Sequence, residues 1–245
     1  MLSFFKSKPL LKDLLSDPYV DIHSHLLPGI DDGAKTITDT IKLVRAFQEM
    51  GVSQFTTTPH INHYVWNNSA QIITAKQQET KLLLEENHIQ IPFQAAAEYF
   101  IDDWFENHFK NEKLLPLKDN YVLVEISYQN APIHLYKTLF ELQVAGYIPV
   151  LAHPERYVYY RKDFNEYQKL KKAGCLFQLN LLAVVGYYGE YICKTAEELL
   201  KKGMYDFTGT DVHHMNHIKA FDQKIKTDSI ANLKEVIANN QFFKF

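Results

Sequence analysis

The sequence predicts an α/β protein with parallel strands, arranged as a (β/α) barrel close to the eight-unit form. Seven short apolar runs, mostly unalternating and bounded by turn residues, are typical of strands that are buried on both faces. Each run precedes a longer segment with helical periodicity, and seven such units in 245 residues are enough for a TIM-like barrel. An open doubly wound sheet is the alternative, which is weakened because no glycine-rich phosphate loop follows the first run.

The expected elements alternate along the whole chain. The strands are expected at residues 19–23, 54–58, 91–97, 121–126, 148–152, 176–179 and 206–209. The helices are expected at residues 36–50, 69–87, 103–109, 134–145, 164–172 and 192–202, with further helical material after the last strand. Several of these helices stop at a glycine, which accepts the left-handed conformation common just past a helix end: Gly51, Gly146, Gly174 and Gly203.

No linker, repeat or low-complexity tract divides the chain, so residues 1–245 are expected to form one domain with residues 1–18 as a lead-in. Lysines follow the apolar start without a small-residue cleavage site, which argues against a signal peptide. No window approaches 18 uncharged apolar residues, so no membrane span is expected. The net charge of −3 disfavours a nucleic-acid binder. The two cysteines exclude a disulfide scaffold and fit a reducing compartment, so a cytoplasmic location is expected.

The chain contains eleven histidines, and many of them fall near the predicted strand ends. Because the carboxyl ends of parallel barrel strands converge on one face, these side chains are expected to meet in a single site. Alternate strand residues share a face, so His23 can act together with His25, and Asp211 with His213. The candidate ligands are His23, His25, His60, Glu98, Glu125, His153, Asp211 and His213.

This ligand set mixes imidazole and carboxylate groups without a thiolate, which suits zinc, manganese or iron. One ion takes three or four protein ligands, so the candidates predict two or three ions. Paired ions can hold a bridging hydroxide and clamp the oxygens of a phosphoryl group. Taken singly, Glu125 could be a buried carboxylate paired with an arginine, and His153 a hydrogen-bonded core histidine. The joint pattern favours the metal site.

The motifs together resemble the polymerase-and-histidinol-phosphatase (PHP) superfamily. The segments DIHSHLLPGIDDGAKT, YVLVEIS, GYIPVLAHPERY and TGTDVHH are similar to the bacterial PHP-type protein-tyrosine phosphatases of capsule and exopolysaccharide loci, over about residues 19–240. The resemblance implies a distorted (β/α)7 TIM-like barrel, the PHP fold. It also implies two or three divalent ions, with manganese preferred and iron or zinc as alternatives. The implied reaction is hydrolysis of phosphotyrosine by a metal-bridging hydroxide, with a bacterial tyrosine kinase as the partner.

The resemblance also implies roles for individual residues. Glu98 is expected to bridge two ions, and Glu98, Asp211 and Arg156 are expected to be catalytic. Arg156 is also expected to bind substrate, because its planar fork suits a phosphate group. The implied metal ligands are the strand-end candidates together with Asp31 or Asp32, of which Asp32 is preferred: His23, His25, Asp31, Asp32, His60, Glu98, Glu125, His153, Asp211 and His213.

Two segments depart from the family pattern. The loop after His60 is aromatic where relatives often carry basic residues, and no arginine follows Asp211 up to residue 219. His63 and His214 are therefore candidate substrate contacts. Three other functions remain open: a phosphatase of a small ester such as histidinol phosphate, a non-catalytic metal-binding PHP protein, and an amidohydrolase of C–N bonds. The last is disfavoured by Glu125 and the terminal Asp-x-His.

Overall fold

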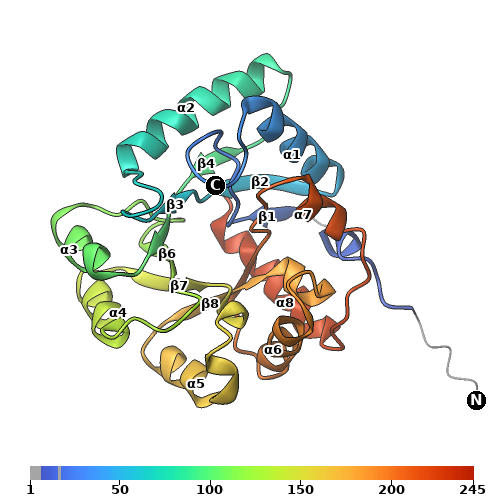
Figure 1. The fold of residues 1–245 in the computed structure, drawn as a ribbon. Helices are drawn as coiled ribbons and strands as arrows, with labels where there is room; N and C mark the ends of the chain where they lie inside the picture. Colours follow the sequence, from blue (N-terminus) through green and yellow to red (C-terminus); the bar gives the residue numbers. More distant parts are fainter. Residues whose placement is uncertain (1–6, 16–17) are drawn as a thin grey trace, which may run out of the picture.

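The structure, a computed structural model, describes residues 7–15 and 18–245. The strands lie at the centre of the molecule and the helices surround them (Figure 1). All strand pairs are parallel, as the sequence predicts. The strands are β1 (Tyr19–Asp21), β2 (Val52–Thr57), β3 (His60–Ile61), β4 (Phe93–Ala95), β5 (Glu98–Phe100), β6 (Tyr121–Glu125), β7 (Ile148–Ala152), β8 (Leu176–Asn180) and β9 (Phe207–Gly209).

The strands form two sheets, with orders β1-β2-β4 and β3-β5-β6-β7-β8-β9. The break falls at the same level in two neighbouring strands, between β2 and β3 and between β4 and β5. Pro59 lies in the first gap and has no N–H to donate to a ladder. Hydrogen bonds nevertheless continue across the gaps, from Ala96 N to Thr57 O at 2.8 Å and from Glu98 N to Pro59 O at 3.1 Å. The predicted uninterrupted strand over residues 91–97 is therefore wrong, because Glu98 lies inside the second half of an interrupted strand.

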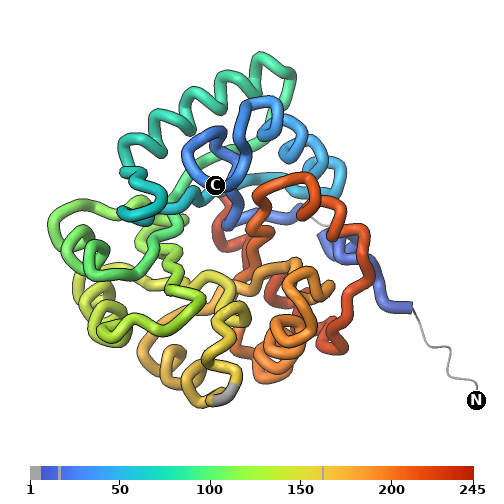
Figure 2. Tube along the Cα trace, viewed as in Figure 1, coloured from blue at the N-terminus to red at the C-terminus, as the bar shows by residue number. Residues whose placement is uncertain are grey.

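The first and last strands meet beyond their regular ends. Ser24 and Val212 form a parallel bridge, and the Asp211 N–H donates to His23 O at 2.7 Å. At the opposite end, the Asn240 side chain donates to Val20 O and to Thr208 O, both at 2.8 Å. The tube trace shows this C-terminal segment in red beside the blue first strand (Figure 2). The architecture is the predicted distorted TIM-like barrel with seven strand positions.

The first three α-helices begin at a side-chain cap, whereas the later described ones begin without one. Thr36 and Asp39 form a reciprocal capping box at the start of α1, and Ser69 caps α2. The α-helices are α1 (Ile37–Glu49), α2 (Ala70–Glu86), α3 (Asp103–Asn111), α4 (Leu135–Val144), α5 (Asn165–Lys172), α6 (Glu190–Lys201), α7 (Met215–Ala220) and α8 (Ile230–Asn239). Each predicted helix is found within a few residues of its expected bounds.

Two buried clusters hold the barrel together. A large one lies between strands and helices, and a smaller one fills the interior with side chains that include Ile22, Leu123, Val150 and Phe207. In the lead-in, Leu11 and Leu15 are fully buried, while the predicted role of residues 1–6 lies outside the described residues. Within the described ranges, no helix has the length and apolarity that crossing a membrane requires.

Candidate metal centre

The deepest part of the site is built from side chains just beyond the carboxyl ends of β1, β7 and β9 and from Glu98, the first residue of β5. His23, His25, Glu98 and His153 are at most 1% exposed, and Asp211 is 2% exposed. His23 and His25 alternate along the chain beyond β1, so both imidazoles face inward. Residues far apart in the sequence therefore share one small volume, as the parallel arrangement predicts.

Glu98 stands at the centre of this group. Its Oε2 lies 3.2 Å from His23 Nε2 and 3.1 Å from His60 Nδ1. Its Oε1 lies 3.2 Å from His153 Nε2. The carboxylate therefore faces ring nitrogens on both of its oxygens, which is the position that a carboxylate shared by two ions would take.

Both Glu98 oxygens are buried, and although ring nitrogens lie 3.1–3.2 Å away, none of them is directed so as to form a hydrogen bond in the described part of the chain. A buried carboxylate without hydrogen-bond partners is costly, so its surroundings need a compensating positive charge. Imidazole and carboxylate donors without thiolate suit manganese, iron or zinc. The residues present therefore fit divalent ions.

The potential ligand atoms fall into four overlapping groups within the described chain, and in each group they lie within 4.8 Å of one another. The overlap arises because His23, His25, His60 and Glu98 each belong to two groups. The groups are His25, Asp32, His60 and His213; His23, Glu98 and His153; His23, His25 and Asp211; and His60, Glu98 and Glu125.

The charges in the site perturb each other strongly. Burial alone would raise the pKa of Glu98, but the neighbouring His23 and His60 outweigh it and hold that pKa well below its usual range. Burial alone would lower the pKa of His60, but Glu125 and Glu98 outweigh it and raise that pKa to about 9. Burial alone would also raise the pKa of Asp211, but the neighbouring His23 outweighs that effect and holds the pKa well below its usual range. Glu98 and Asp211 therefore stay ionised, the state in which a carboxylate can hold a cation.

The two aspartates that follow the first histidine pair have different surroundings. Asp31 is buried, and its Oδ2 accepts a hydrogen bond from His25 Nδ1 at 2.8 Å. Asp32 instead directs Oδ1 toward His60 Nε2 at 3.5 Å and His213 Nε2 at 3.4 Å. Of these two aspartates, Asp32 belongs to one of the ligand groups found in the described chain and Asp31 belongs to none. Asp31 fixes the tautomer of His25, leaving Nε2 free to face the centre.

Backbone conformation aims two of these side chains. His153 and Asp211 have φ values of +38° and +48°, in the left-handed region that non-glycine residues rarely adopt. His153 directly follows β7, and Asp211 is the second residue after β9. Such strain persists where the surrounding structure overdetermines it, and it clusters at functional sites.

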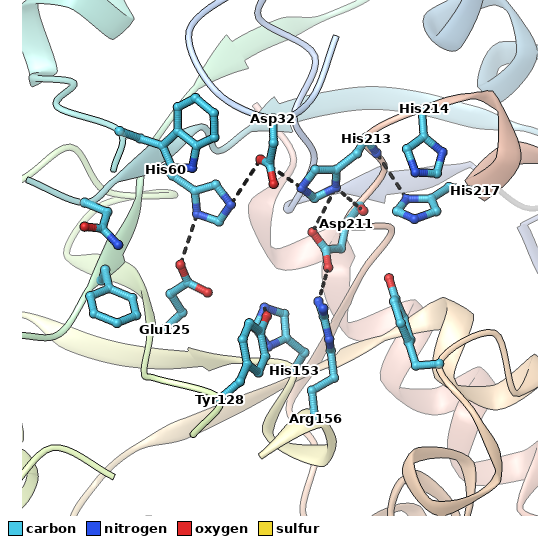
Figure 3. A pocket seen from close by; sticks show the side chains of 14 residues that line it. Asp32, His60, Glu125, Tyr128, His153, Arg156, Asp211, His213, His214 and His217 are labelled. Carbon is cyan, nitrogen blue, oxygen red and sulfur yellow. Dashed lines mark hydrogen bonds and ion pairs between the residues drawn. The ribbon is translucent and has the colours of Figure 1, made fainter. Parts of the chain in front are cut away.

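A pocket of about 430 Å³ is lined by part of this histidine and carboxylate cluster, including His60, Glu125, His153 and Asp211 (Figure 3). Its walls also carry the aromatic side chains of Trp66, Phe100, Tyr128 and Tyr188, together with Asp32 and His213. Arg156 reaches across the pocket and donates from Nη1 to Asp211 Oδ2 at 2.9 Å. An arginine beside a set of cation ligands makes the pocket suitable for an anionic group.

The predicted substrate contacts differ in their placement. His214 lines the pocket, and His217 lines it beside His214. His63 does not line this pocket: its exposed ring stacks on Trp104 of α3 at a centroid distance of 5.1 Å. The reason is the tight turn closed by Asn62 and Trp66, which directs Trp66 inward and leaves His63 outside.

Sequence reasoning missed several supporting residues. Gln178 on β8 bonds to His23 Nδ1 at 3.0 Å, and so orients that imidazole as Asp31 orients His25. Asn180 donates from Nδ2 to Asp211 Oδ2 at 2.8 Å. The available signal was weak: Gln178 lies on the strand predicted at residues 176–179 and Asn180 directly follows it, and this strand ends without a histidine or carboxylate.

A parallel barrel with overlapping imidazole and carboxylate groups at its carboxyl strand ends has the architecture of a metal-dependent hydrolase. More particularly, the chain belongs to the capsular polysaccharide synthesis CpsB/CapC family, whose model matches residues 19–227. The predicted family is thereby confirmed.

Known relatives agree with this assignment. The tyrosine-protein phosphatase YwqE of Bacillus subtilis (strain 168) is 31% identical over 198 residues, covering 80% of this chain and 78% of the relative. A solved structure described as YwqE from Bacillus subtilis and CpsB from Streptococcus pneumoniae, "unique metal-dependent tyrosine phosphatases", matches with a TM-score of 0.77 at 27% identity, covering 88% of this chain and 86% of that one. Histidinol phosphate phosphatase from Lactococcus lactis, at 15% identity and a TM-score of 0.54 over 92% and 94% of the two chains, shares the fold.

Proposed function

We propose that the chain is a metal-dependent protein-tyrosine phosphatase that hydrolyses phosphotyrosine in proteins. The observation that carries the proposal is Glu98, a buried carboxylate surrounded by histidine nitrogens and lying below an arginine-bearing pocket. The names of the relatives, tyrosine-protein phosphatase and metal-dependent tyrosine phosphatase, support the same activity.

The ligand groups support a site for divalent ions, of which the proposal takes two or three. Imidazole and carboxylate donors suit zinc, manganese and iron alike, and the proposal takes manganese from the family resemblance. In this proposal, His23, His25 and Asp211 hold one ion, and His60, Glu98 and Glu125 hold a second, with His153 completing the set around Glu98. Asp32 and His213 would form a third site beside them, and His60, whose neutral imidazole has one lone pair, would serve either the second ion or the third. When bound, such ions supply an activated water and neutralise the oxygens of a phosphoryl group.

The pocket residues act on the substrate itself. Arg156 binds phosphoryl oxygens, since its guanidinium presents several N–H donors in one plane. His214 contributes a further polar group at the rim. Trp66, Phe100 and Tyr128 give the walls an aromatic lining that suits the phenyl ring of phosphotyrosine.

The physiological substrate in this proposal is a phosphorylated bacterial tyrosine kinase of a capsule or exopolysaccharide locus. The family description, capsular polysaccharide synthesis, supports that setting. Cys175 and Cys193 are free and buried, which is compatible with a reducing compartment, and we place the protein in the cytoplasm.

The test compares hydrolysis of a phosphotyrosine peptide and of histidinol phosphate by the manganese-loaded protein. We expect kcat/KM to favour the peptide and Glu98→Gln to abolish both activity and stoichiometric metal binding. Glu79→Gln, which removes an exposed carboxylate on α2, is the matched control and should behave like the wild type. Preference for histidinol phosphate, or a full metal content without turnover of either ester, contradicts the proposal.

A further inference from the structure

Arg156 is held between two tyrosine rings. Its guanidinium carbon lies 4.7 Å from the ring centroid of Tyr128 and 4.4 Å from that of Tyr188. Tyr128 follows β6, Arg156 follows β7 and Tyr188 follows β8, so three successive barrel strands supply the three side chains. Figure 3 shows Tyr128 and Arg156 side by side in the pocket.

The end of the guanidinium is fixed as well. Arg156 donates from Nη1 to Asp211 Oδ2, the oxygen that also accepts from Asn180 Nδ2. Asn180 Nδ2 in turn lies 3.1 Å from the hydroxyl oxygen of Tyr188, which links the ring to the same network. The other oxygen of Asp211 lies 3.3 Å from His23 Nε2 and 3.3 Å from His25 Nε2. Asp211 therefore joins the arginine to the ligand groups.

This arrangement has a direct consequence for anion binding. The faces of a guanidinium stack well on aromatic rings, whereas its N–H donors all lie in the plane. Rings whose centroids lie 4.7 and 4.4 Å from the guanidinium carbon restrict access to its faces, which favours binding of a pocket ligand at its N–H edge. An arginine side chain that is already immobilised loses less rotamer entropy when it binds a phosphate.

We propose that Tyr188, together with Tyr128, is a positioning residue that holds the Arg156 guanidinium edge-on to the phosphoryl group of the substrate. The proposal rests on the proposed phosphatase function for the identity of the ligand. It assigns the tyrosines no contact with the reacting atoms. Tyr188 is the better residue to change, because the Tyr128 hydroxyl lies 3.4 Å from His153 Nε2 and a change there would disturb the ligand groups.

The experiment is calorimetric titration of the manganese-loaded protein with inorganic phosphate, with metal content measured for every variant. We expect Tyr188→Leu to weaken phosphate binding about tenfold, and Tyr188→Phe, which keeps the ring, to stay within about twofold of the wild type. In an Arg156→Ala background, Tyr188→Leu should have no further effect. Tyr191→Leu is the matched control, because it removes a tyrosine stacked on Arg161 at 4.5 Å, a pair absent from the lining of the pocket.

The proposal is overturned if Tyr188→Leu binds phosphate as tightly as the wild type does. It is also overturned if Tyr188→Leu weakens phosphate binding as much in the Arg156→Ala variant as in the wild type. Tyr188→Met, which retains bulk without a ring, replaces Tyr188→Leu if the latter does not fold. Because phosphate binding needs no turnover, the two proposals can fail separately. A wild type that binds phosphate with this Tyr188 dependence but hydrolyses no phosphotyrosine peptide refutes the proposed function alone.

Discussion

Replacing Asp31 by asparagine tests whether this buried carboxylate orients a ligand or is one itself. Asp31 accepts hydrogen bonds from His25 Nδ1 at 2.8 Å, from Gly33 N at 2.9 Å and from His60 N at 3.3 Å. Burial favours its neutral form, but the charge of His25 outweighs that effect and the pKa of Asp31 is lowered. Asp31→Asn retains the shape but removes the charge and one acceptor oxygen.

The expected loss follows from these contacts. An asparagine oxygen can keep one of the two short bonds, and the amide nitrogen then faces an N–H donor of His25 or Gly33. His25 thereby loses the charge-assisted partner that fixes its tautomer. Removing such a supporting partner typically weakens metal binding 10- to 100-fold, which corresponds to about 1.4 to 2.7 kcal/mol. The number of ions bound at saturation should not change.

The assay is competition with a chelator of known affinity, followed by elemental analysis of the saturated protein. Asp39→Asn is the control, since Asp39 belongs to the capping box of α1 and to none of the ligand groups. Asp32→Asn should instead lower the number of ions bound. The reasoning is refuted if Asp31→Asn removes one ion while Asp32→Asn leaves the full number in place.

Three further outcomes are expected. Iodoacetamide should leave phosphatase activity intact, because Cys175 and Cys193 are buried and burial raises the pKa of Cys175 to about 12. EDTA should abolish that activity and added manganese should restore it. Loss of activity on alkylation would contradict a mechanism that uses no cysteine. Burial raises the pKa of Glu155 to about 7, so its stabilising contribution is complete below about pH 4.5 and is lost as pH rises through about 7. Urea unfolding of Glu155→Gln should lack up to about 3 kcal/mol of this pH dependence, and an unchanged slope would count against the assignment. Gly209→Ala should destabilise the protein by about 1–3 kcal/mol in thermal unfolding, because the added Cβ would overlap the Gln178 amide and lie 2.6 Å from His23 Cβ; a wild-type melting temperature would disprove that packing.

The local pattern of the chain was sufficient to predict most elements. The strand at residues 148–152 matches β7 residue for residue, because its flanking turn and helix signals are unambiguous. The strand expected at residues 91–97 is found instead as β4 and β5, which are separated by Ala96 and Ala97. This interruption lies beside the one at Pro59 in the neighbouring strand, so it depends on strand pairing. Strand breaks of this kind arise from pairing between segments, which a single segment does not encode.

The sequence by itself determined that histidines and carboxylates gather at one end of the barrel. That follows from topology, since parallel strands joined by helices must all end on the same face. Only the tertiary structure decided which aspartate supports His25 and which faces His60, because the backbone conformation of an irregular loop sets the direction of each side chain and has no period that the sequence could show. Only the tertiary structure brought the rings of Tyr128 and Tyr188 within 4.7 Å of the Arg156 guanidinium carbon. Those contacts join three separate loops, and their geometry depends on loop backbone conformation rather than on any periodic pattern in the chain.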